Sequence, residues 1–277
     1  TSVAGYEGIW INLDPETSTA TVNHNTFSGE VMRAVTTERS KTTISNNTIT
    51  TDLAAGAYGA GGWQGINIGG ANGSTNGPDY GPLSAVSVTG NTITRSTAGN
   101  GFSYGIKMGY DASASWSGVS ITGNMISKCN LDVWVKYGNA GGILLNGNSI
   151  LSTAQNDGTG TLDATCNWWG SVDYNVILGS ISGNVTFVNY LVPDAGGSTY
   201  PWSGTDTYSC TGGVWPVHNV TKNLYYNTIQ PAIDGADASG NLITAAAGSY
   251  PENLSFNKSL TLTGAGLLTT TITGMHT

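Results

Sequence analysis

The feature of this sequence that most constrains its fold is a short pattern that recurs along the chain. The pattern is an apolar residue, two further residues, an asparagine, one more residue and a second apolar residue. Val22–Phe27 and Ile44–Ile49 are two clear copies. A unit this short cannot bury its own apolar side chains, so successive units must stack on one another. The recurring asparagines are Asn25, Asn47, Asn91, Asn124, Asn148 and Asn184.

A second pattern, of short alternating runs, lies between the asparagine copies. Gly8–Ile11, Gly65–Ile68 and Gly105–Met108 each fit a strand with one buried face. Each repeat therefore contains at least two short strands, an asparagine turn and a loop of variable length. Asparagine tolerates the left-handed backbone of a sharp corner, and its amide can bond to the asparagine of the next coil. The sequence thus predicts an all-β solenoid of parallel strands with a ladder of asparagines.

Composition excludes several classes of protein. Only 9% of the 277 residues are charged, and the formal net charge is −8. With nine Lys plus Arg and no basic cluster, the sequence does not predict a nucleic-acid partner. No apolar run is long enough to predict insertion into a membrane. The three cysteines allow at most one intramolecular disulfide and show no zinc-binding spacing.

Two kinds of segment carry a resemblance to a known family. Asp163–Gly170 is similar to the motif that closes many right-handed parallel β-helix domains of the pectate-lyase-like superfamily, with Cys166, Asn167, Trp168 and Trp169 at its centre. Thr228–Ile233, Gly248–Asn253 and Lys258–Gly266 resemble the opening of such a domain. More narrowly, the chain resembles the secreted bacterial and archaeal surface repeat proteins of that group. The resemblance implies a right-handed parallel β-helix with a short capping helix near residues 228–236.

The order of these segments predicts three parts. Residues 1–192 would be the C-terminal portion of one β-helix, residues 193–216 a connector rich in Gly, Ser, Thr and Pro, and residues 217–277 the cap and first coils of a second β-helix. Such a chain begins inside a coil and stops after a few coils, so we expect uncovered strand edges at both ends. If the last coils of one subunit complete the first coils of the next, a filament results. The predicted contact residues are Gly8, Ile9, Trp10, Ile11, Leu260, Leu262 and Ile272.

The sequence predicts no catalytic, cofactor-binding or metal-binding residue. Its acidic residues are scattered, whereas lyases of this fold use clustered aspartates with calcium and a basic proton acceptor. A structural calcium ion would be compatible with the fold, but no residue pattern supports it. His24, His218 and His276 are isolated, and Glu252 is expected to bond to backbone or to cap a turn.

The leading hypothesis is therefore a non-enzymatic, secreted structural protein at the cell surface, which binds copies of itself head to tail. A window cut from a longer repeat protein would explain the same order of segments. A surface adhesin that binds cell-surface glycans through aligned tryptophans is the alternative function, and a polysaccharide lyase or hydrolase is a third.

Overall fold

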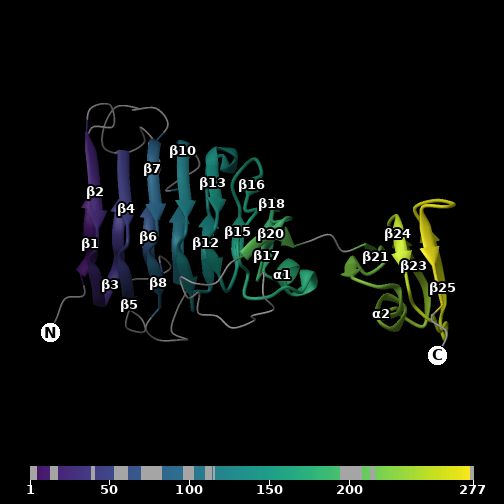
Figure 1. Cartoon of the computed structure of the whole chain (residues 1–277). Helices are drawn as coiled ribbons and strands as arrows, with labels where there is room; N and C mark the ends of the chain where they lie inside the picture. The colour runs from purple at the N-terminus through teal and green to yellow at the C-terminus, as the bar shows by residue number, and fades with distance from the viewer. Residues whose placement is uncertain are drawn as a thin grey trace. The chain divides into compact units, whose positions relative to one another are not determined.

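The computed structural model describes residues 5–12, 18–38, 41–52, 62–69, 83–95, 103–109, 114, 116–193, 208–212 and 216–274. The chain divides into two compact units (Figure 1). Unit 1 contains residues 1–172 and 179–212, and unit 2 contains residues 173–178 and 213–277. The short segment 173–178 groups with unit 2, although it lies between two stretches of unit 1 in the sequence.

Unit 1 is a parallel β-helix built from three sheets, as the repeat pattern predicts. Sheet B contains β2 (Thr19–Asn23), β4 (Lys41–Ser45), β7 (Leu83–Thr89), β10 (Trp116–Thr122), β13 (Ile143–Asn146), β16 (Leu162–Asp163) and β18 (Val185–Thr186). Sheet C contains the first part of β3 (Thr26–Thr37), β5 (Thr48–Asp52), β8 (Thr92–Thr94), β11 (Met125–Ser127) and β14 (Ser149–Ile150). Sheet A contains β1 (Gly5–Ile11), the second part of β3, β6 (Trp63–Ile68), β9 (Ser103–Met108), β12 (Leu131–Val135), β15 (Ala154–Asn156) and β17 (Ile181–Gly183).

The core of unit 1 consists of columns of aliphatic side chains, one column for each sheet. In sheet A, Val35, Ile66 and Ile106 are directly paired on neighbouring strands, and all are fully buried. Equivalent columns continue in sheet B (Ile44, Val88, Ile121, Leu145) and in sheet C (Ile49, Ile93, Ile126, Ile150). β-Branched residues suit this stacking because their restricted side chains pack well on a pleated surface.

The asparagine ladder runs along the corner between sheets B and C. Asn91 shows the repeating geometry: its backbone N–H and its Nδ2 both donate to Oδ1 of Asn124, over 3.0 and 2.9 Å. Its Nδ2 also donates to the carbonyl of Ile44 at 2.9 Å. The same pair of donors links each rung to the next, in the order Asn25, Asn47, Asn91, Asn124, Asn148 and Asn167.

Two details of the predicted ladder are wrong. Asn184 is exposed and lies off the ladder, where its Nδ2 donates to Thr161 Oγ1 at 2.9 Å; Asn167 of the closing segment forms the last rung instead. The ladder asparagines also do not adopt the left-handed conformation. That conformation belongs to the preceding residue, as at His24, with φ of 55°, and Gly90, with φ of 66°. The left-handed residue turns the chain, which leaves the asparagine free to direct its amide into the corner.

The closing segment terminates the asparagine ladder. Nδ2 of Asn167 donates to the carbonyl of Ala164 at 2.8 Å rather than to a further asparagine. Trp168 and Trp169 are both 4% exposed, and Trp169 makes an edge-to-face contact with Phe187. A large aromatic layer of this kind removes the end of the apolar core from water.

Part of the predicted connector belongs to unit 1. Strand β20 (Tyr208–Gly212) pairs antiparallel with β19 (Tyr190–Pro193), and Cys210 forms a disulfide with Cys166. The composition of residues 193–216 resembles a linker, but tertiary pairing overrides that local preference at its C-terminal end.

Unit 2 contains a small sheet and a capping helix. Strands β22 (Leu224–Tyr226), β21 (Val217–Asn219), β23 (Ser239–Ala245) and β25 (Ser259–Gly264) form one sheet, and β24 (Gly248–Tyr250) pairs with β26 (Thr270–Ile272). Helix α2 (Ile229–Asp234) confirms the predicted cap, because Ile229, Ala232 and Ile233 enter the buried core of the unit. Helix α1 (Tyr174–Gly179) is joined to β22 by two hydrogen bonds between Asn175 and the backbone of Tyr225.

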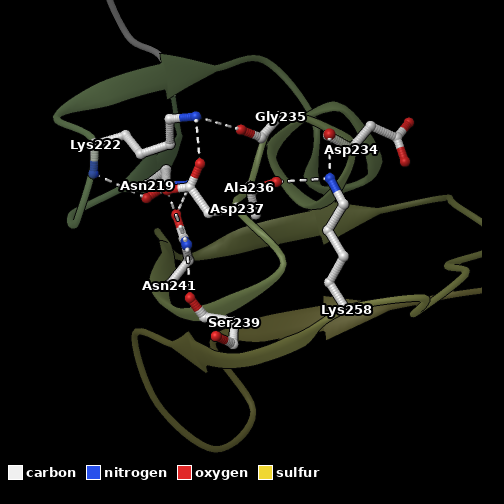
Figure 2. A network of polar contacts seen from close by, with 9 residues as sticks. All are labelled: Asn219, Lys222, Asp234, Gly235, Ala236, Asp237, Ser239, Asn241 and Lys258. Carbon is white, nitrogen blue, oxygen red and sulfur yellow. Dashed lines mark hydrogen bonds and ion pairs between the residues drawn. The ribbon is translucent and has the colours of Figure 1, made fainter.

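Both ends of helix α2 are capped by side chains from elsewhere in unit 2. Glu252 accepts hydrogen bonds from the backbone N–H groups of Ile229 and Gln230, at 2.8 and 2.9 Å, as expected for a backbone-capping role. At the other end, Lys222 and Lys258 donate to backbone carbonyls, Lys222 to Gly235 at 3.0 Å (Figure 2). An anion at the N-terminus and cations at the C-terminus both complement the helix dipole.

Candidate functional site

The first candidate site is the open end of unit 1, formed by β1, β2 and the start of β3. The N–H of Glu38 donates to the carbonyl of Ile11, so the backbone groups of Ile11 face β3. The backbone N–H and C=O groups of successive residues in a strand point to opposite edges of that strand. The N–H and C=O of Trp10 therefore point away from β3. Among the described residues, no strand pairs with that outer side of β1 or β2. The Trp10 side chain is itself 59% exposed.

The asparagine ladder has an unused acceptor at this end. Every later rung receives two hydrogen bonds at Oδ1, from the backbone N–H and Nδ2 of the rung before it. Oδ1 of Asn25 receives none from the described residues, although its N–H and Nδ2 both donate to Asn47. The corner thus presents a hydrogen-bond acceptor in the geometry that a further coil would use.

The predicted contact residues fall on strands at the outer limits of the two units. Gly8, Ile9, Trp10 and Ile11 lie in β1, where Ile11 is buried and Ile9 is half-buried. In unit 2, Leu260 and Leu262 lie in β25 and are half-buried, while Ile272 in β26 is 45% exposed. The apolar residues of the last described coil are therefore less covered than those of the coil before it, where Ile243 is fully buried.

The second candidate site is the outer face of sheet A, which sequence reasoning missed. Strand register places Thr36, Asn67, Lys107 and Trp134 side by side on successive coils. Thr36, Asn67 and Lys107 are buried although they lie outside the core column, and Thr36 Oγ1 and Asn67 Oδ1 have no hydrogen-bond partner. Buried polar groups of this kind are costly unless a ligand or water satisfies them.

Cationic and aromatic side chains surround these polar groups. The rings of Tyr104 and Trp134 stack with centroids 4.5 Å apart, and Trp134 Nε1 donates to Asp157 at 2.9 Å. The Lys136 ammonium group lies 5.3 Å from the centre of the Trp134 ring and 5.0 Å from that of Tyr137. We refer to Arg33, Lys107, Lys136, Tyr104 and Trp134 as the cationic cluster.

Burial, together with the nearby charges of Lys136 and Arg33, lowers the pKa of Lys107 to about 8. One signal in the sequence could have revealed the cluster. Each alternating run has one residue that points away from the core, and in successive runs these residues are Trp10, Asn67, Lys107 and Trp134.

Replacing Lys107 with methionine is expected to stabilise the protein at neutral pH by about 1–3 kcal/mol, because no acidic side chain among the described residues pairs with the buried ammonium group. The unfolded chain keeps the lysine proton up to a pKa near 10.5, whereas the folded chain loses it near 8. The wild-type protein therefore gains stability as the pH rises through this interval. Urea unfolding at about pH 7 and about pH 9.5 should show an advantage for Lys107→Met that shrinks at the higher pH. An advantage that is equal at both values would contradict this account.

A buried carboxylate elsewhere in unit 1 has a structural role. Asp132 is fully buried, and its Oδ2 accepts hydrogen bonds from the N–H groups of Leu151 and Ser152, both at 2.7 Å. Burial raises its pKa to about 6, against the opposing effect of these hydrogen bonds. Burial likewise raises the pKa of the neighbouring free thiol, Cys129. Asp132 fixes the corner between β14 and β15 of the next coil, because both of its N–H donors belong to that corner.

The histidines remain separate. His24 is exposed, His218 stacks on Tyr225 in unit 2, and His276 lies outside the described residues. Within the described ranges, no three His, Cys, Asp or Glu side chains gather as metal ligands would. In the same part of the chain, no helix has the length and apolar character needed to cross a bilayer.

No family model, curated protein or solved structure matches this chain. The resemblance to secreted β-helix repeat proteins consequently stays a prediction from the motifs, while the parallel β-helix itself is a property of the structure.

Proposed function

We propose that this is a non-enzymatic, extracellular structural protein whose open end receives a β-helical coil from a second copy. The observation that carries the proposal is the unused acceptor of Asn25 beside the outer edges of β1 and β2. The Cys166–Cys210 disulfide is compatible with an oxidising, extracellular location.

The contact would be an addition of strands to exposed sheet edges. Backbone hydrogen bonds supply affinity in such contacts, and side-chain pockets supply specificity. The half-buried Ile9 and exposed Trp10 offer apolar surface on one partner. Leu260, Leu262 and Ile272 offer it on the other, so both surfaces would lose contact with water on association. In a head-to-tail contact of this type each added subunit still exposes its other end. Further subunits can therefore add, and a filament results.

Replacing Trp10 with proline is expected to abolish this association and leave unit 1 folded. Proline removes an N–H that faces away from β3, so no hydrogen bond to a described residue is lost. Wild-type protein should form particles that grow with concentration in sedimentation velocity and appear as fibres by negative-stain electron microscopy. Trp10→Pro should remain monomeric with an almost unchanged melting temperature.

The matched control is Trp10→Thr, which loses the same side chain but keeps the N–H. It should still assemble, with weaker affinity. Wild-type protein that stays monomeric at high concentration would contradict the proposal, as would Trp10→Pro protein that assembles as well as wild type.

A second candidate function, binding of an anionic glycan, is supported by the cationic cluster. Its cations and the stacked Tyr104 and Trp134 rings suit a sugar that carries carboxylate or sulfate groups. Calorimetric titration with uronic-acid oligosaccharides should show binding that weakens with salt and with Lys136→Ala. Lys128→Ala, which removes a lysine from outside the cluster, is the control. Binding that Lys136→Ala leaves unchanged would exclude this site.

A further inference from the structure

Unit 2 has a hollow on the outer face of its sheet that is independent of both sites in unit 1. The hollow has a volume of about 400 Å³. Strand register places His218, Thr244 and Thr263 in one row across β21, β23 and β25, and all three line it. Binding sites for small molecules commonly have volumes of about 300–1,000 Å³.

One wall of the hollow is an imidazole ring that is held in place. His218 stacks on Tyr225 with centroids 4.0 Å apart and planes 4° apart, and its Nε2 lies 3.2 Å from Asn223 Oδ1. Tyr225 is the cross-strand neighbour of His218 on one side, and Thr244 is its neighbour on the other. One ring face is covered by Tyr225, so the face on the side of Thr244 is the one left for a ligand.

The remaining lining is small and uncharged. Ala246 and Ala265 have small side chains that leave room in the hollow, and apart from the His218 imidazole none of the lining residues is ionisable. Thr244 Oγ1 donates to the carbonyl of His218 at 3.4 Å, which leaves its oxygen lone pairs available to accept a hydrogen bond. Thr263 is exposed and offers a second hydroxyl on the neighbouring strand.

We propose that this hollow, which we call the threonine groove, binds one unit of a neutral saccharide. The apolar C–H face of a sugar ring fits against a flat, immobilised aromatic face, and its hydroxyl groups match the two threonine hydroxyls. A charged sugar would lose hydration in the groove with no opposite charge to replace it. The inference goes beyond the assembly proposed above, because it involves neither the open end nor the cationic cluster.

The test is saturation-transfer NMR and calorimetric titration of the whole chain with neutral gluco-, manno- and xylo-oligosaccharides, with uronic-acid oligosaccharides as the charged comparison. We expect at least one neutral series to bind and His218→Ala to weaken that binding by about tenfold. Thr263→Val should weaken it by a few-fold, through loss of one hydrogen bond.

Thr261→Val is the matched control, since Thr261 lies in the same strand but does not line the groove. It should bind as wild type does. Failure of every neutral series to bind would overturn the proposal. So would a neutral sugar whose affinity is unchanged by both His218→Ala and Thr263→Val, in protein whose circular dichroism shows that it is folded.

Discussion

Replacing Asn124 with alanine is expected to lower the free energy of unfolding by about 4 kcal/mol. Asn124 is 1% exposed and lies in the interior of the ladder. Its loss removes the acceptor for both the N–H and Nδ2 of Asn91, and the donor for Oδ1 of Asn148 and the carbonyl of Val88. The N–H of Asn91 is then left buried with its acceptor gone, and the other groups each lose one hydrogen bond. Nδ2 of Asn91 keeps its bond to Ile44, and Oδ1 of Asn148 keeps the backbone N–H of residue 124.

Urea unfolding followed by circular dichroism measures this loss, and Asn184→Ala is the matched control. Asn184 occurs in a similar sequence pattern but is exposed and lies off the ladder, so we expect a cost below about 1 kcal/mol. Equal effects of the two substitutions would show that the ladder contributes no more than an ordinary surface asparagine.

Reduction of the Cys166–Cys210 disulfide is expected to destabilise unit 1 by about 4 kcal/mol, from the chain entropy of the closed loop. The two cysteines are 44 residues apart, so the cross-link strongly restricts the unfolded chain. In the folded protein the bridge joins β20 to the corner residue before the last ladder rung, so its reduction also loosens the attachment of β20.

Thermal unfolding with and without a non-thiol reductant tests this expectation. The reductant should lower the melting temperature of the wild-type protein but not that of Cys210→Ser, which should already resemble the reduced protein. The buried free thiol, Cys129, provides a control: Cys129→Ala should leave the sensitivity to reductant unchanged. A wild-type melting temperature that does not respond to complete reduction would contradict the entropic account.

Much of the ladder could be predicted because its pattern is local. The five rungs from Asn25 to Asn148 each follow an apolar strand residue by three positions, and that strand sets where the corner falls. The last rung could not be predicted in this way, because Ala164–Trp169 keeps the spacing but starts with a small apolar residue, whereas Ile181–Phe187 starts with a typical one. Burial decided between them: Asn167 is fully buried under the aromatic closing layer, whereas Asn184 is exposed.

The candidate sites could be predicted only in part. The strand edge at Gly8–Ile11 follows directly from the alternating pattern. The cationic cluster does not, because Arg33, Lys107 and Lys136 are far apart in sequence and separated by loops of different length. The same holds for the threonine groove, since Thr244 and Thr263 meet only through the pairing of β23 with β25.

By itself, the sequence determined that this chain forms stacked parallel coils, with aliphatic columns inside and asparagines at one corner. Those features arise from periodicity and turn chemistry within a few residues, which a single chain segment encodes. Only the tertiary structure decided which asparagine ends the ladder, which segment of the apparent connector folds back as β20, and which polar side chains share an outer face. These depend on the register between coils, and register is set by packing across loops whose lengths vary from one coil to the next.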